Sequence, residues 1–367
     1  MIPIDALFEA SKYDKKIKIR SADLTRIKKK YLSPMNFSKK LLFDSMFNGK
    51  TVIFNNYPIE NRIPKNQSKV EATLALLRNN LKKNDKIFIR YGSNRTLKKV
   101  TINNVIDRWL RGRSKFGVTD LHFRHTNYFA KIDADAISYF NLLPLFPEEV
   151  SFLEMLTLVI SSKGIFSDSH SDDGDGSNHC IIGKKLWFAW DKIEGETVGL
   201  QNCSFDSVYS QAKFSIDKFL SLKSAHWFLV SEGQTLFMPG NFTHKVITLE
   251  SYIGFGSFYV SFPNYINSIK RWLLYYSSDV TTDFINILNT KCIKYIRETV
   301  QQMDSTKQEE IGFNYFLKAV LSWENGLTKN QINEFTSNVS TRNLLMEGKT
   351  SADKSICKNL ADGRSIV

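Results

Sequence analysis

Between residues 118 and 262, short apolar segments alternate with turn-forming residues, and this pattern restricts the fold more than any other feature of the chain. Glycine, proline, asparagine and aspartate separate the segments, as they do where strands are joined by tight turns. Evenly spaced short strands of this kind predict an antiparallel sandwich or barrel. The strand candidates are 119–124, 152–161, 180–190, 226–230, 234–239, 245–249 and 252–262.

Helices are predicted on both sides of this strand-rich region. Apolar residues recur at helical spacing in 1–48, 70–81 and 101–112, with Gly112 near the end of the last helix. Strands are predicted at 50–58 and 85–92, and helical spacing returns after Pro263. We therefore expect a mainly β protein with flanking helices, organised as a mixed N-terminal region 1–117, a β core 118–262, a C-terminal helical bundle 263–340 and a flexible tail 341–367.

The chain is strongly basic, with a net charge of +13 and basic clusters at 15–20, 26–30 and 108–113. Such a field attracts acidic partners, including nucleic acid. It also serves simply to solvate a surface, and we favour that interpretation because no nucleic-acid-binding motif accompanies the clusters. The apolar faces of the C-terminal helices favour a packing role and leave open a homodimer formed through them.

The cysteine pattern and the N-terminus bear on the compartment. The four cysteines form no CxxC pair and no dense cluster, which suits free thiols in a reducing compartment. The N-terminus shows no secretory signal, and no apolar run approaches the roughly 18 residues of a membrane helix. We expect a protein of the cytoplasm or nucleus that does not cross a membrane.

Residues 165–191, IFSDSHSDDGDGSNHCIIGKKLWFAWD, combine histidine and aspartate just before an apolar strand. His170 and Asp172 are two residues apart, so on a strand both side chains point to the same face. His244 follows the Pro-Gly-Asn turn of MPGNFTH and opens a later strand that could lie alongside. Two histidines and one carboxylate on one face, with open positions left on the metal, are typical of non-haem Fe(II) oxygenases.

A second requirement of such chemistry is an anchor for a dicarboxylate cosubstrate. Lys185 lies fifteen residues after His170 in the apolar strand GKKLWFAWD, where a buried setting strengthens pairing with a carboxylate. Because side chains alternate along a strand, Lys184 and Lys185 face opposite sides and only one points inward. Ser167, three residues before His170, offers a hydroxyl to the same carboxylate.

The stretches SDSHSD, GKKLWF and EGQTLFMPGNFTHKVITLESYIGFGSF resemble the Jumonji C (JmjC) family of cupin-fold oxygenases that depend on Fe(II) and 2-oxoglutarate. The resemblance implies a double-stranded β-helix, the cupin jelly roll. It implies His170, Asp172 and His244 as iron ligands, with Lys185 and Ser167 holding the far carboxylate of 2-oxoglutarate and O2 as the other cosubstrate. Ser257 stands where the lysine demethylase branch has an asparagine that contacts the cosubstrate.

The resemblance implies an enzyme that hydroxylates a protein or peptide side chain, because the sequence lacks the zinc-finger modules that often accompany chromatin demethylases. The spacing from His170 to the Gly-x-Lys is also nearer to the asparaginyl hydroxylase branch. The alternatives are an N-methyl-lysine demethylase, a hydroxylase of RNA or of a small molecule, and a non-catalytic cupin that only binds. Tyr128 and His125 are candidates for lining the pocket. His179 and His226 are expected to be structural, and the DDGDG stretch is expected to be a plain loop, since the helices and glutamate of an EF-hand are missing.

Overall fold

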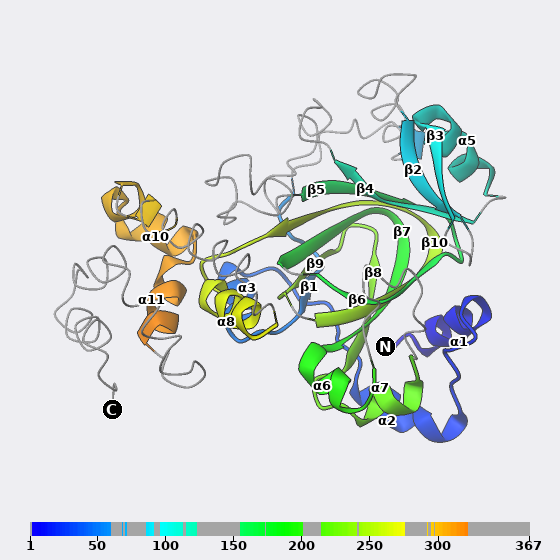
Figure 1. Cartoon of the computed structure of the whole chain (residues 1–367), viewed down its shortest axis with the longest axis horizontal. Helices are drawn as coiled ribbons and strands as arrows, with labels where there is room; N and C mark the ends of the chain where they lie inside the picture. Colours follow the sequence, from blue (N-terminus) through cyan, green and yellow to red (C-terminus); the bar gives the residue numbers. More distant parts are fainter. Residues whose placement is uncertain are drawn as a thin grey trace. The chain divides into compact units, whose positions relative to one another are not determined.

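The chain is described here from a computed structural model (Figure 1). It describes residues 2–59, 68, 70–71, 86–91, 96–112, 115–122, 155–172, 174–200, 214–240, 242–275, 292, 295–296 and 298–321. The chain divides into two compact units. The first comprises Met1–Ser38, Thr51–Ser138 and Met155–Phe258, and the second comprises Lys39–Lys50, Tyr139–Glu154 and Tyr259–Val367.

The first unit is built on an antiparallel sheet with the strand order β1-β9-β7-β10-β5-β4-β2-β3, in which β6 pairs with β10 and β8 pairs with β7. The pairings between the described strands are antiparallel, as the short, evenly spaced apolar segments predict. The strands are β1 (Val52–Phe54), β2 (Lys86–Tyr91), β3 (Thr96–Thr101), β4 (Phe116–His122), β5 (Met155–Ser161), β6 (Phe166–Ser171), β7 (Asp175–Asp191), β8 (His226–Ser231), β9 (Thr235–Met238) and β10 (Phe242–Tyr259).

Two long strands, β7 and β10, change partners along their length (Figure 1). β10 pairs with β6 near its start and with β5 near its end. β7 pairs first with β9 and then with β8. The prediction of separate strands at 245–249 and 252–262 was therefore wrong, because the polar residues Glu250 and Ser251 lie within one continuous extended strand.

Helices cover one face of this sheet. They are α1 (Ile4–Tyr13), a 3₁₀ turn at Ser21–Asp23, α2 (Leu24–Lys29), α6 (Lys192–Thr197) and α7 (Ile216–Ser221). Apolar residues of α1, α2 and α7 pack with Phe188, Trp190, Trp227 and Ile247 of the strands. A second buried cluster lies on the opposite face of the same strands and includes Trp187, Phe228, Val246 and Tyr252. We call this second cluster the inner cluster.

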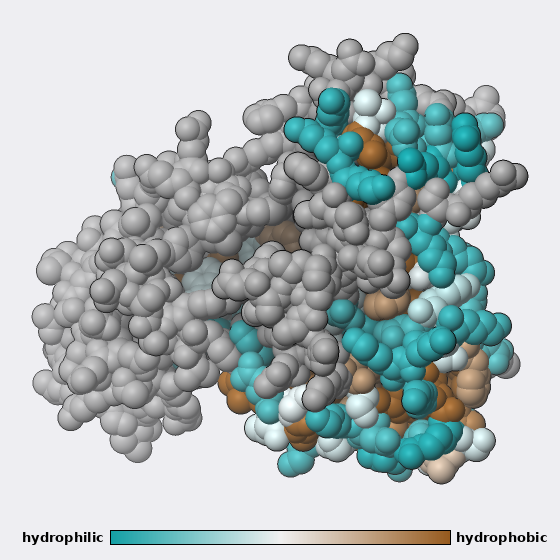
Figure 2. Space-filling model, turned by 45° about the vertical axis from the view of Figure 1, so that its right-hand side comes forward, coloured by the Kyte–Doolittle hydropathy of each residue, from teal (hydrophilic) through white to brown (hydrophobic). Residues whose placement is uncertain are grey.

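The β2–β3 hairpin leads into α5 (Ile102–Arg111), which is one residue shorter at each end than the predicted helix at 101–112. The hydroxyl of Thr101 accepts a hydrogen bond from the Asn104 N–H at the start of the helix. Gly112 ends it in the left-handed conformation. Hydrophilic side chains gather over this hairpin and helix (Figure 2).

The second unit contains α3 (Lys39–Phe47), α8 (Tyr265–Tyr275), a 3₁₀ turn at Val300–Gln302, α10 (Ser305–Glu310) and α11 (Phe313–Leu321). α11 packs against α3, α8 and α10. Rings of Phe262, Phe313 and Phe316 stack or meet edge to face within this unit. In the described part of these helices no large apolar side chain is exposed, and the expected homodimer stays a prediction.

The structure confirms a mainly antiparallel β protein with flanking helices. Only residues 70–71 of the predicted helix at 70–81 are described, and they are helical. The predicted tail at 341–367 lies outside the described residues. Among the helices that are described, none has the length and apolar character needed to cross a membrane.

Candidate metal centre

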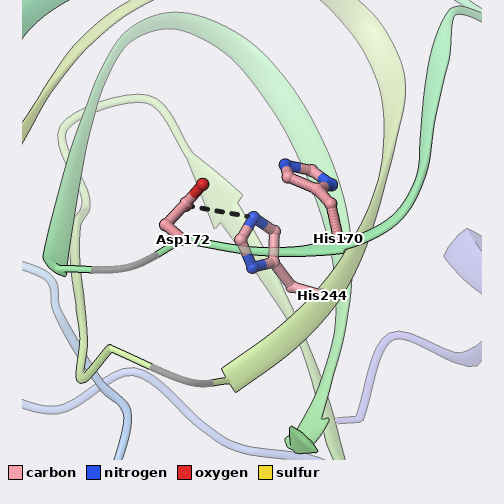
Figure 3. Close-up of side chains that lie close together, drawn as sticks. All are labelled: His170, Asp172 and His244. Carbon is pink, nitrogen blue, oxygen red and sulfur yellow. Dashed lines mark ion pairs between the residues drawn. The ribbon is translucent and has the colours of Figure 1, made fainter. Parts of the chain in front are cut away.

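His170, Asp172 and His244 come together in the first unit (Figure 3). His170 of β6 lies directly opposite His244 of β10, and their ring centroids are 4.2 Å apart. Asp172 follows the end of β6, and its Oδ2 lies 3.7 Å from Nε2 of His244. One ligand atom from each residue fits within 4.8 Å of the others, so this group could hold a metal ion.

A β-bulge in β6 decides which side chains share the face of the two histidines. His244 pairs with His170, but Val246 pairs with Ser167, so β6 has one more residue than β10 in this interval. Strict alternation would place Ser167 and His170 on opposite faces, because they are three residues apart. The extra residue reverses the alternation, and Ser167 therefore faces the same side as His170, His244 and Val246.

Hydrogen bonds to main-chain carbonyls orient both imidazoles. The Nδ1 of His170 lies 2.8 Å from the carbonyl oxygen of Asp168, and the Nδ1 of His244 lies 3.1 Å from that of Phe242. A carbonyl oxygen only accepts, so each Nδ1 carries the proton and donates it. Each Nε2 keeps its lone pair for a metal, in the arrangement common to metal-binding histidines.

Burial shifts the pKa of two of the three residues. It lowers the pKa of His244 well below the usual value, and the neighbouring His170 lowers it further. The ring of His244 also contacts the ring of Trp187, with centroids 5.3 Å apart. Burial raises the pKa of the Asp172 carboxyl, and His170 opposes that rise. His244 is therefore neutral at physiological pH, which is the form that binds metals.

Lys185 is buried, whereas its neighbour Lys184 is at the surface. The ammonium of Lys184 lies 2.7 Å from Oε1 of Glu250. The ammonium of Lys185 lies 4.2 Å from the centre of the Tyr252 ring, on the side of the inner cluster. Within the described part of the chain no carboxylate pairs with it. Burial lowers the pKa of Lys185 to about 7.

Ser167 is another polar residue on this side that has no hydrogen-bond partner among the described residues. Its hydroxyl is buried. Val246, which Ser167 faces across the strand pair, packs in the same inner cluster as Tyr252. A buried unpaired ammonium and an unsatisfied hydroxyl turned to one cluster are what a bound carboxylate would complete, so these two residues fit a dicarboxylate cosubstrate.

The other candidate residues have different positions. Ser257 is buried in β10; its N–H donates to the hydroxyl of Ser177, and its own hydroxyl donates to the Phe258 carbonyl. Neither bond reaches the three metal-binding candidates. Tyr128 and His125 lie outside the described residues.

His179 and His226 have the structural positions expected of them. His179 hydrogen-bonds Thr235 and packs on Phe255, and the Nδ1 of His226 lies 2.9 Å from the Ser224 carbonyl oxygen. Burial lowers the pKa of His226 to about 4, which keeps it neutral.

One buried residue near the candidate metal centre, Lys245, was not predicted from the sequence. Lys245, next to His244, is fully buried and pairs with Asp14 and Asp168. The only signal is a lysine inside the apolar strand segment THKVITL, and the sequence does not show which carboxylates would meet it.

No protein-family profile matches the chain, and no curated protein matches it with significant similarity. The case for a function therefore rests on the residues of this chain.

Proposed function

We propose that the first unit is an oxygenase of the cupin type that depends on Fe(II) and 2-oxoglutarate. One observation carries the proposal. The bulge in β6 and the pairing of β6 with β10 place three metal-binding candidates on one face, and that face also turns Ser167 toward the inner cluster where Lys185 is buried. A metal site alone would not need a buried, unpaired lysine.

Each residue of the proposed site has a role in binding iron or 2-oxoglutarate. His170 and His244 would bind iron through Nε2, and Asp172 through a carboxylate oxygen, leaving positions open on the metal. Lys185 and Ser167 would fix the far carboxylate of 2-oxoglutarate and thereby its orientation. Trp187 and Tyr252, both buried, exclude water from this side of the site. When bound, iron and 2-oxoglutarate supply O2-dependent hydroxylation of a C–H bond, coupled to decarboxylation of 2-oxoglutarate to succinate and CO2.

The substrate class we propose is a protein or peptide side chain, on the spacing between His170 and the Gly-x-Lys segment. An N-methyl-lysine demethylase would use the same iron chemistry. Ser257 disfavours it, because the expected asparagine is replaced and the serine is already engaged with its own main chain and Ser177. A non-catalytic cupin or a small-molecule hydroxylase remains an alternative that the same assay separates.

A specific observation supports a nucleic-acid substrate as the second candidate. In residues 12–30 the two carboxylates, Asp14 and Asp23, are buried and paired with Lys245 and Arg20. Lys16 and Arg20 of this segment pair with carboxylates, but other exposed cations of the segment form no ion pair with a described residue, among them Lys15, Lys18, Arg26, Lys28 and Lys29. This leaves a strongly positive surface, which we call the basic segment.

The test is turnover of 2-oxoglutarate by protein purified without oxygen and loaded with Fe(II). We expect slow release of succinate without substrate, faster release with the right substrate, and none from His170→Ala. Mass spectrometry of peptide, methyl-lysine, RNA and metabolite pools then identifies the product. Gain of one oxygen means hydroxylation, and loss of a methyl group means demethylation. Binding of 2-oxoglutarate without any succinate would indicate a non-catalytic cupin.

A further inference from the structure

Behind the candidate metal centre, on the opposite face of β10, lies a fully buried cation. The side chain of Lys245 is 0% exposed. Its Nζ lies 2.6 Å from Oδ2 of Asp14 and 3.4 Å from Oδ1 of Asp168, and 4.7 Å from the centre of the Phe166 ring. An ammonium this deeply buried depends on its carboxylate partners, because removing one leaves an uncompensated charge.

Asp14 belongs to the N-terminal segment, where hydrogen bonds to its main chain and its side chain fix its position. It directly follows α1 as the C-cap residue, and its N–H donates to the carbonyl of Ala10. Its other carboxylate oxygen, Oδ1, accepts a hydrogen bond of 2.9 Å from the N–H of Lys16. The Nζ of Lys16 in turn lies 3.7 Å from Oδ1 of Asp168. The segment from α1 to Lys16 therefore contributes both an acid and a base to one network.

This network contacts the main chain that carries both histidines. Asp168, which pairs with Lys245, is the residue whose carbonyl oxygen accepts the hydrogen bond from His170 Nδ1. Lys245 directly follows His244 in β10. Asp168 also lies within the bulged stretch of β6 that turns Ser167 and His170 to one face. A change in these ion pairs would therefore move the main chain that positions both His170 and His244.

We propose that Lys245, Asp14 and Asp168 are positioning residues, through which the N-terminal segment fixes the geometry of the metal ligands. The proposal rests on the proposed metal centre. Outer residues that orient metal-binding histidines typically change metal affinity by about 10–100-fold when they are replaced. We expect an effect of that size here, although none of the three residues contacts the metal.

The experiment measures Co(II) binding to the full chain, with the visible absorption of bound Co(II) reporting ligand geometry. The single variant Asp14→Asn leaves Lys245 unpaired on one side and tests the network directly. The double variant Asp14→Asn with Lys245→Met removes both buried charges together, so it remains informative even where the single variant fails to fold. Urea unfolding establishes that each variant is folded before its affinity is compared.

We expect both variants to bind Co(II) about 10–100-fold more weakly and to show an altered Co(II) spectrum. Lys184→Met is the matched control, because it breaks a lysine–carboxylate pair at the surface and should leave affinity and spectrum unchanged. Lys245→Arg keeps the charge and should recover part of the affinity. Wild-type affinity and spectrum in the folded double variant would overturn the positioning role. Failure of the wild-type protein to bind Co(II) would instead refute the metal centre.

Discussion

Lys185 places an ammonium group among apolar side chains, over the ring of Tyr252. Burial lowers the pKa of Lys185 to about 7, which means that the folded protein without ligand disfavours the charged form. Replacing even a buried ion pair by apolar residues of similar volume is often stabilising by about 1–4 kcal/mol, and a buried charge without a carboxylate partner is costlier still. We therefore expect Lys185→Met to raise the free energy of unfolding of the ligand-free protein by an amount in this range, measured by urea denaturation.

The same substitution should remove the anchor for 2-oxoglutarate. Loss of a partner that pairs with a buried carboxylate costs roughly 3–5 kcal/mol, or two to four decades in the dissociation constant. We expect this loss for Lys185→Met in titrations of the Mn(II)-loaded protein with 2-oxoglutarate. Lys184→Met should change neither quantity much, because Lys184 is at the surface. Unchanged 2-oxoglutarate affinity in both variants would contradict the cosubstrate assignment.

The lowered pKa also predicts how stability depends on pH. Unfolded lysine has a pKa of about 10.4, so between about pH 7 and 10 the unfolded chain holds a proton at Lys185 that the folded chain does not. Where the unfolded state binds more protons, stability rises with pH. We expect the ligand-free protein to gain up to about 4 kcal/mol from this residue across that window, at about 1.4 kcal/mol per pH unit.

The measurement is the difference between the urea stabilities of the wild-type protein and Lys185→Met at several pH values. All other groups titrate in both proteins, so the difference isolates Lys185. It should shrink as the pH rises from about 7 to about 10. Parallel stability curves for the two proteins would mean that Lys185 keeps an ordinary pKa.

At the scale of the element, simple alternation predicts only part of the site. It predicts that the side chains of His170 and Asp172 share a face and that those of Lys184 and Lys185 do not, because these residues are only two positions and one position apart. It fails between Ser167 and His170, where the bulge adds a residue that no composition signal reveals. It fails again at Lys245, whose partner Asp14 is distant in sequence, so that only the folded chain brings the two together.

A glycine inside β7, just before the two lysines, leads to a further prediction. Gly183 has φ +90°, and a Cβ added there would lie 2.2 Å from the main-chain oxygen of Ser251 in β10. Gly183→Ala therefore combines backbone strain with a clash against another strand. Gly233 also has a positive φ, of +79°, but nothing lies within 4 Å of an added Cβ.

Both substitutions should incur strain of about 1–3 kcal/mol, and the clash should add about 1–3 kcal/mol at Gly183 alone. Urea denaturation of the two variants gives the comparison directly. Because Gly183 sets the course of β7 just before Lys185, its variant should also bind 2-oxoglutarate more weakly than Gly233→Ala does. Equal decreases in stability would show that the close approach of Gly183 to Ser251 is relaxed at little cost.

At the scale of the whole molecule, the chain has a net charge of +13, and the cations that form ion pairs are spread unevenly over it. In the basic segment, the exposed side chains of Lys15, Lys18, Lys28 and Lys29 form no ion pair with a described residue, whereas Lys16 pairs with Asp168. Elsewhere lysines are matched, as Lys39 is with Glu310, Lys40 with Asp44, Lys163 with Glu9 and Lys184 with Glu250. In the described chain the exposed large apolar side chains, Phe8, Met35, Leu110 and Ile193, lie outside residues 12–30. Under the proposed nucleic-acid alternative, the charge of this segment would therefore be its recognition feature.

The nucleic-acid alternative predicts salt-dependent binding of RNA through the basic segment. Removing one lysine that pairs with a phosphate lowers the slope of log affinity against log salt by about 0.7–0.9. The variant Lys15→Gln, Lys18→Gln, Lys28→Gln and Lys29→Gln should therefore lower the slope by about 3, measured by fluorescence anisotropy with a labelled RNA. The control variant carries Lys39→Gln, Lys40→Gln, Lys163→Gln and Lys184→Gln, which makes the same change in net charge at paired positions. An equal decrease in both variants would reduce the effect to net charge, and no RNA binding by the wild-type protein would leave the protein substrate as the remaining proposal.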